Sequence, residues 1–213
     1  MITVKKFVFN PFYENTYLVY DNDTRAAAVI DPGCYNEKER KILTDTIDEN
    51  ELILKYLVNT HCHIDHIFGN SFIKENYNPI FIAPEEDLFL LDLMVEQGNV
   101  YGTPLSPSPN PDKFISESMA FCLGNVCGKF LHVPGHSPGG YCLYFESEKI
   151  CFTGDVLFKE SIGRTDLWGG DFNTLIKSIR DKLFTLPDDV KILPGHESYS
   201  TIGYEKSNNR FLV

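Results

Sequence analysis

The sequence has few basic residues for its length. Its 213 residues include 19 Lys and Arg against 30 Asp and Glu, which gives a formal net charge of −11. No run of Lys or Arg offsets this charge locally, whereas a phosphate backbone is bound by a basic patch or stripe. The charged runs Glu37–Lys41 and Pro187–Asp189 are typical of solvated surfaces. We therefore expect no nucleic-acid partner.

Long hydrophobic runs are also missing. No apolar segment approaches the roughly 20 residues needed to cross a bilayer. The chain begins directly with the strand-like segment Ile2–Phe9, without a basic stretch followed by an apolar one. These features predict a cytoplasmic protein with no membrane partner. The apolar content is near the average of soluble proteins, so residues 1–213 can form a single α/β domain with a sizeable core.

The six cysteines contain no C-x-x-C pair, and the chain is not short enough to need disulfides. We predict mostly buried free thiols of a cytosolic protein. One of them, Cys62, lies within a histidine-rich segment, where its side chain is expected to face away from any bound ion. A role for Cys62 as a ligand or nucleophile is the less favoured alternative.

Histidine is scarce, yet half of the six histidines lie in one segment. His61, His63 and His66, together with Asp65, directly follow the apolar run Leu52–Val58. Imidazole nitrogens and carboxylate oxygens suit zinc and iron. Positions two apart point in nearly opposite directions on a helix, so a loop at the end of a buried strand is expected. Four donors crowd one tetrahedral ion, which indicates two ions sharing the loop. The alternative is a polar turn that happens to be rich in histidine.

Three further candidate ligands each follow a segment that is expected to be a strand. His136 lies in the turn-rich element 135–140, Asp155 follows Ile150–Phe152, and His196 follows Val190–Ile192. Sites in α/β sheets gather beyond the carboxyl ends of strands. We therefore expect these side chains to converge with the histidine cluster.

The order of these residues resembles the metallo-β-lactamase superfamily, whose signature is H-x-H-x-D-H followed by three later ligand motifs. The segment Val29–Gly33 matches a further family motif. The resemblance implies an αββα four-layer sandwich of the α/β class, with two metal ions. The implied ligands are His61, His63 and His136 for the first ion, Asp65, His66 and His196 for the second, Asp155 as a bridge between them, and Asp31 as a supporting residue.

The same resemblance implies hydrolysis by attack of a metal-bridging hydroxide, with Asp65 and Asp155 as the catalytic carboxylates. The expected cofactors are two divalent ions, zinc in the first place, with iron or manganese as alternatives. The segment Gly154–Asp166 resembles the corresponding stretch of glyoxalase II-type enzymes. Arg164 stands where that family has a basic residue that contacts the glycine carboxylate of glutathione. Alternatively, Arg164 pairs with Asp166 or Asp171 and only holds the loop.

The chain ends 17 residues after His196, whereas full-length glyoxalase II enzymes continue into a helical glutathione-binding domain. The chain resembles the compact single-domain glyoxalase II-like hydrolases, whose C-terminal segment is similar to Gly203–Asn209. We expect a small-molecule substrate, S-acylglutathione or a related thioester. Two alternatives stay open: a persulfide dioxygenase with one iron on His61, His136 and Asp155, and a metal-binding module without activity.

The pattern along the chain predicts alternating strands and helices. His132, on a predicted strand, is expected to have a structural role or to support a ligand. Gly98–Asp112, with four prolines, is expected to be a surface loop near the site. Helices are predicted over Glu37–Glu49 and Ile67–Asn76, after Pro84, and along the apolar stripe from Phe172 to Leu183. Strands are predicted at Ile2–Phe9, Thr16–Tyr20, Ala26–Ile30, Leu52–Asn59, Ile80–Ala83, Met119–Leu123, Lys129–Val133, Tyr141–Phe145, Lys149–Phe152 and Val190–Leu193.

Overall fold

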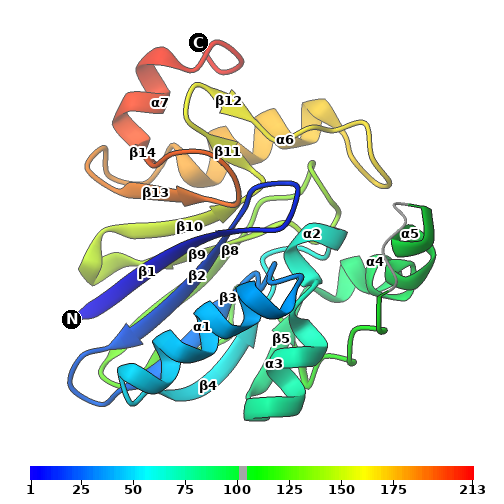
Figure 1. Cartoon of the computed structure of the whole chain (residues 1–213). Coiled ribbons are helices and arrows are strands. Elements are labelled where there is room, and N and C mark those ends of the chain that lie inside the picture. The colour runs from blue at the N-terminus through cyan, green and yellow to red at the C-terminus, as the bar shows by residue number, and fades with distance from the viewer. Residues whose placement is uncertain (101–104) are drawn as a thin grey trace.

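Two six-stranded sheets pack face to face, with helices on both outer faces (Figure 1). The computed structural model describes residues 1–100 and 105–213. The arrangement confirms the predicted αββα sandwich of the α/β class. No helix within the described residues is both long and apolar enough to cross a membrane.

The first sheet follows chain order. Its strands are β1 (Ile2–Phe9), β2 (Glu14–Asp21), β3 (Ala26–Ile30), β4 (Ile53–Val58), β5 (Ile80–Ala83) and β6 (Lys113–Phe114). The first three are antiparallel, and β3 to β6 run parallel. Helix α1 (Glu37–Glu49) makes the crossover from β3 to β4; Asn36 caps it by accepting a hydrogen bond from the Glu39 N–H. Leu43 and Ile47 of α1 are buried against the sheet.

The second sheet has the order β14 (Ser200–Thr201), β13 (Lys191–Pro194), β10 (Ile150–Gly154), β9 (Tyr141–Phe145), β8 (Val126–His132) and β7 (Phe121–Leu123). The parallel strands β10 and β13 are connected through a small hairpin of β11 (Leu157–Phe158) and β12 (Ser161–Ile162), and then helix α6 (Phe172–Ser178). A π-helical turn, η3 (Ile179–Leu183), continues α6, and α7 (Ile202–Asn208) covers the same face.

Three apolar layers hold the sandwich together. Strand β2 is buried along its whole length because both of its faces are covered. Tyr17 and Val19 point into the layer between the sheets, where they meet Phe152 and other residues of the second sheet. Leu18 and Tyr20 point the opposite way, into the layer under α1. A third layer lies between the second sheet and helices α6 and α7. Burial of each large apolar side chain stabilises the fold by about 1.5–3 kcal/mol.

The helix predicted at Ile67–Asn76 is instead two helices, α2 (Ile64–Ile67) and α3 (Asn70–Tyr77). They are interrupted because the Gly69 N–H donates to the Pro32 carbonyl at 2.7 Å rather than to the preceding helical turn. The break anchors α2, which carries two candidate ligands, to the end of β3.

The helix predicted after Pro84 is broken as well. It consists of the 3₁₀ turn η1 (Glu85–Asp87), α4 (Leu88–Asp92) and α5 (Met94–Val100). The loop prediction for Gly98–Asp112 was therefore wrong for residues 98–100, which belong to α5. Residues 105–112 have no regular structure, as predicted, while 101–104 lie outside the described residues.

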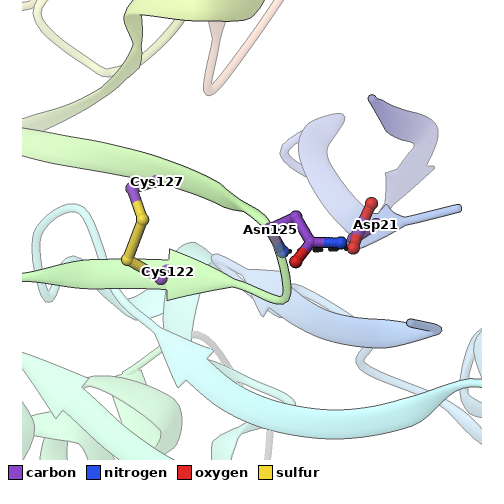
Figure 2. Close-up of a disulfide and its surroundings, with 4 residues drawn as sticks. All are labelled: Asp21, Cys122, Asn125 and Cys127. Carbon is purple, nitrogen blue, oxygen red and sulfur yellow. Dashed lines mark hydrogen bonds between the residues drawn. A yellow bond between two sulfur atoms is a disulfide. The ribbon is translucent and has the colours of Figure 1, made fainter. Parts of the chain in front are cut away.

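The cysteine prediction needs a correction, because Cys122 and Cys127 form a disulfide (Figure 2). These residues are paired directly across the β7–β8 hairpin, a relation that their spacing in the sequence does not reveal. The other four cysteines are buried free thiols, as predicted. Cys62 packs in the apolar layer under the helices of the first sheet, away from the candidate ligands.

Candidate metal centre

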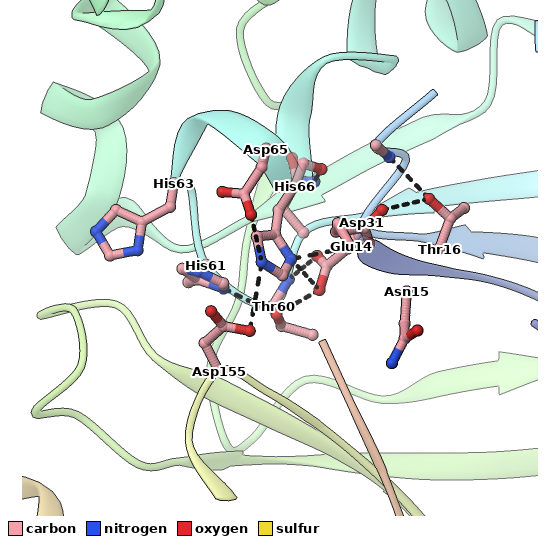
Figure 3. Close-up of polar contacts among 12 residues, drawn as sticks. Glu14, Asn15, Thr16, Asp31, Thr60, His61, His63, Asp65, His66 and Asp155 are labelled. Atoms are coloured by element: carbon pink, nitrogen blue, oxygen red, sulfur yellow. Dashed lines mark hydrogen bonds and ion pairs between the residues drawn. The ribbon is translucent and has the colours of Figure 1, made fainter. Parts of the chain in front are cut away.

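The candidate ligands converge at the carboxyl ends of strands from both sheets. His61 follows β4, Asp155 directly follows β10, and His196 follows β13. His136 lies in the turn after β8, and the short helix α2 contributes Asp65 and His66. Figure 3 shows His61, His63, Asp65, His66 and Asp155 gathered around one point. The structure thus brings together all seven residues that were predicted as ligands.

The first group consists of His61, His63 and His136, whose candidate ligand atoms lie within 4.8 Å of one another. Nε2 of His136 is 2.7 Å from Nδ1 of His63 and 3.3 Å from Nε2 of His61. Burial, with help from neighbouring rings, lowers the pKa of His63 to about 3 and that of His61 well below its usual value. These rings are therefore neutral at physiological pH, the form in which imidazole binds a metal.

The second group consists of Asp65, His66 and His196. Oδ2 of Asp65 lies 3.1 Å from Nε2 of His196 and 3.7 Å from Nε2 of His66. The pKa of His66 is raised well above its usual value. Burial opposes this shift, but the nearby carboxylates of Asp155 and Asp65 outweigh it. The second group is therefore richer in negative charge than the first.

Asp155 lies between the two groups. Its Oδ1 is 3.4 Å from Nε2 of His66, and its Oδ2 is 3.7 Å from Nε2 of His136 and 3.5 Å from Nε2 of His196. Burial raises the pKa of the Asp155 carboxyl, yet His66 and His196 hold it well below its usual range. Asp155 is thus an ionised carboxylate that lies within 3.7 Å of imidazole nitrogens from both groups, an arrangement suited to a bridging ligand.

Gly195 makes room for this carboxylate. A Cβ atom at position 195 would lie 2.3 Å from Oδ1 of Asp155 and 2.6 Å from Cε1 of His66, closer than real Cβ contacts come. Only glycine therefore fits at this position without displacing two candidate ligands.

The donor set fits metal ions. Nε2 of His66 and Oδ1 of Asp155 are buried and face each other at 3.4 Å, and neither makes a hydrogen bond to any other residue that the structure describes. Buried polar atoms of this kind are costly unless something pairs with them. Imidazoles and carboxylates around such atoms are the ligands that zinc and iron take.

Asp31 supports the cluster from behind. Its carboxylate accepts hydrogen bonds from the Thr60 main-chain N–H at 2.7 Å and from the Thr60 hydroxyl at 2.6 Å, and it lies 3.2 Å from Nδ1 of His66 (Figure 3). Asp31 is also close enough to His61 and His66 to form a third candidate ligand group. Because Thr60 engages both of its oxygens, the geometry favours a supporting role, in which partners of this kind orient metal-binding imidazoles.

His132 and Arg164 lie outside the ligand groups. Nε2 of His132 is 3.0 Å from the Pro138 carbonyl oxygen, and the ring stacks on Tyr141. The exposed Arg164 side chain donates two hydrogen bonds to Asp166, at 2.7 and 2.8 Å. The hydrogen bond from Arg164 lowers the pKa of Asp166 to about 2. The loop-holding contact considered for Arg164 is therefore present.

Two buried carboxyl groups near the centre were missed by the sequence analysis. Oε1 of Glu14 lies 4.0 Å from Nδ1 of His66, and its other oxygen accepts a hydrogen bond from the Thr16 hydroxyl. Asp87 is fully buried and accepts hydrogen bonds from the loop that carries His61 and His63 and from the loop that carries His136. Asp87 ends the acidic run Glu85–Asp87, and nothing in the sequence distinguishes it from its two neighbours. For Glu14, the only sequence signal is a charged residue just before the predicted strand Thr16–Tyr20.

A cavity of about 650 Å³ opens over the cluster. His63, Asp65, His136, Asp155 and His196 form its floor, and Arg164 lies in its wall. The side chains of Phe12, Tyr13, Leu167 and Trp168 add an apolar and aromatic part to the wall. The cavity is large enough for a small organic substrate that has both a polar and an apolar part.

Known proteins share this fold and resemble the sequence over most of its length. The model of the metallo-beta-lactamase superfamily matches residues 9–196. The chain is 43% identical to hydroxyacylglutathione hydrolase GloC of Haemophilus influenzae over 203 residues, which cover 94% of this chain and 93% of that protein. Among the solved structures, the BLEG-1 B3 metallo-beta-lactamase is 30% identical with a TM-score of 0.90, and the match covers 99% of this chain and 100% of that one. TTHA1623 in a di-iron-bound form is 31% identical with a TM-score of 0.86, and the match covers 98% of this chain and 100% of that one. The chain therefore belongs to the metallo-β-lactamase superfamily.

Proposed function

We propose that this protein is a glyoxalase II-type thioesterase, a metal-dependent hydrolase that cleaves S-acylglutathione or a related small-molecule thioester. The observation that carries the proposal is the position of Asp155 in the floor of the cavity, where its carboxylate faces His136 of the first ligand group and His66 and His196 of the second. The 43% identity to a hydroxyacylglutathione hydrolase over nearly the whole chain supports the choice of substrate class.

The proposed cofactors are two divalent ions. His61, His63 and His136 would hold the first ion, and Asp65, His66 and His196 the second, with Asp155 between them. We propose zinc, with iron and manganese as alternatives that the same ligands accept; the related TTHA1623 has been solved with two irons. When bound, such ions lower the pKa of water from 15.7 to about 7 and polarise a carbonyl group.

The protein's own residues prepare this chemistry. Asp31 and Thr60 hold the imidazoles of His66 and His61 in place, because Oγ1 of Thr60 also lies 3.2 Å from Nδ1 of His61. Phe12, Leu167 and Trp168 form an apolar part of the cavity wall, against which a bound substrate would exclude water from the reacting atoms. Oriented ligands and exclusion of water strengthen the electrostatic stabilisation of a developing oxyanion.

Arg164 is the proposed contact for a carboxylate of the substrate. It lines the cavity, and its planar guanidinium can bind a carboxylate through two parallel hydrogen bonds, as it does with Asp166. We propose that Asp166 orients the guanidinium of Arg164. A carboxylate of the substrate would then bind the guanidinium beside Asp166 or in its place.

The persulfide dioxygenase stays as the second candidate, since a single iron on His61, His136 and Asp155 needs only part of the cluster. The ligand set does not separate the two candidates, because the dioxygenase branch keeps the residues of the second group as well. The 43% identity to a hydroxyacylglutathione hydrolase over nearly the whole chain favours the hydrolase. The non-catalytic module has no observation in its favour.

The test is hydrolysis of S-lactoylglutathione by metal-replete protein, followed by loss of thioester absorbance. A kcat/KM within the usual enzyme range of about 10⁴–10⁸ M⁻¹s⁻¹ supports the proposal. A negligible rate, combined with oxygen uptake on glutathione persulfide and one iron per chain, would establish the dioxygenase instead. A β-lactam substrate serves as the counter-screen, given the likeness to BLEG-1.

We also propose that residues 1–213 form one domain, because the middle apolar layer takes side chains from both sheets. A cytoplasmic location stays a prediction: the four buried free thiols favour it, and the Cys122–Cys127 disulfide counts against it.

A further inference from the structure

Asp87 is the N-cap residue of α4. The side chain of an aspartate at an N-cap usually accepts a hydrogen bond from a main-chain N–H in the first turn of the same helix. The Asp87 side chain makes no such bond. Its carboxylate is fully buried and points instead toward two loops that carry candidate metal ligands.

The contacts of Asp87 join these two loops. Oδ2 accepts a hydrogen bond from the main-chain N–H of Cys62 at 3.1 Å, and Cys62 lies between His61 and His63. The same oxygen accepts from the Ser137 hydroxyl at 2.8 Å, next to His136. Oδ1 accepts from the Gly139 N–H at 2.7 Å. One buried carboxylate thus contacts the sequence neighbours of all three histidines of the first group.

The packing around this carboxylate is tight. A Cβ atom at Gly139 would lie 2.7 Å from Cγ of Asp87 and 2.5 Å from Cβ of Pro84. The loop after His136 can therefore approach Asp87 only because residue 139 is glycine. Gly139, in the loop after His136, therefore packs directly against Pro84 and Asp87.

We infer that Asp87 is a positioning residue for the first metal ion: it fixes the loop of His61 and His63 relative to the loop of His136. The two loops come from different sheets, through β4 and β8, and besides Asp87 a main-chain hydrogen bond from the Tyr141 N–H to the Thr60 carbonyl, at 2.9 Å, joins them. The inference rests on the proposed metal centre and is independent of the substrate. Partners that orient ligands in this way typically contribute about 10–100-fold to metal affinity.

The test measures zinc affinity of the metal-free protein by competition with a chromophoric chelator. Asp87→Ala should weaken binding of one zinc ion by about 10–100-fold. Ser137→Ala, which removes one of the three hydrogen bonds, should weaken it by less. Loading with cobalt(II) adds a readout of ligand geometry: the visible spectrum should change in Asp87→Ala.

Glu205→Ala is the matched control. Glu205 is also a fully buried carboxylate with three partners, since it accepts from the Glu160 N–H at 2.9 Å, from the Asn209 amide at 2.9 Å and from the Ser200 hydroxyl. It lies on α7, and these bonds involve neither the loop of His61 and His63 nor the loop of His136. Its loss should lower stability but leave zinc affinity within about twofold and the cobalt spectrum unchanged.

Two results would overturn the inference: wild-type zinc affinity in a folded Asp87→Ala variant, or equal losses of affinity in Asp87→Ala and Glu205→Ala. If Asp87→Ala does not fold, the zinc affinities of Ser137→Ala and Gly139→Ala are measured instead. Wild-type zinc affinity in both of these variants would reject the inference. Absence of zinc binding by the wild-type chain would instead reject the metal centre itself, a different outcome from unchanged affinity in the variants.

Discussion

Nδ1 of His136 lies 2.7 Å from the main-chain carbonyl oxygen of Arg164. A carbonyl oxygen can only accept, so Nδ1 of His136 carries the proton and Nε2, which faces His61 and His63, keeps its lone pair. The loop of Arg164 thus orients a ligand with its backbone and presents a guanidinium to the cavity with its side chain. These two roles can be separated by mutation.

Arg164→Ala tests the side-chain role. It keeps the backbone carbonyl that holds His136, so metal content should be unchanged. KM for a glutathione thioester should rise about tenfold or more, since a charge-assisted hydrogen bond is worth about 1.5–3 kcal/mol. KM for a neutral thioester without a carboxylate should change little. Steady-state kinetics on both substrates provide the measurement.

The matched variant is Asp166→Ala, which removes the partner of Arg164 and keeps the guanidinium. If the ion pair only holds the loop, both variants should affect the two substrates equally. That result would remove Arg164 from the substrate site and leave it a structural role.

Asp155→Ala tests the bridge between the two ligand groups. Removal of a carboxylate that faces His66, His136 and His196 should lower metal content to one ion per chain or less and abolish thioester hydrolysis. Metal analysis of the purified variant gives the answer. Two ions at full occupancy in this variant would contradict the proposed dinuclear centre.

His132→Gln tests whether the sixth histidine is a ligand. Its Nε2 contacts the Pro138 carbonyl, and the ring stacks on Tyr141, so we expect the metal to stay. The free energy of unfolding should fall by about 0.5–1.5 kcal/mol, the usual net contribution of one hydrogen bond. Denaturant unfolding and metal analysis check the two parts, and complete loss of metal would refute this assignment.

The double variant Cys122→Ser/Cys127→Ser tests the disulfide. The bond closes a loop of only four intervening residues, so loop-closure entropy gives it about 2 kcal/mol of stabilisation at most. The hairpin keeps its strand pairing, and the Asn125 N–H still donates to Asp21 at 3.3 Å (Figure 2). A modest fall in melting temperature with unchanged metal content and activity is expected. Loss of metal in this variant would show that the hairpin influences the site at a distance.

The sequence by itself determined the donor chemistry and the fold class. Three histidines and an aspartate within His61–His66 specify a metal site because ligand preference is a local property of the side chains. The alternation of apolar residues likewise predicted most strands, because burial on a sheet face repeats every second residue.

Only the tertiary structure decided how the donors face one another. Nδ1 of His63, but Nε2 of His136, faces into the first group, and no spacing in the sequence encodes that choice. The same holds for Asp87, the Arg164–Asp166 pair and the Cys122–Cys127 bond. Each depends on contacts or on backbone geometry that exist only once the strands have paired and the two sheets have packed together, and a linear pattern carries no such distances.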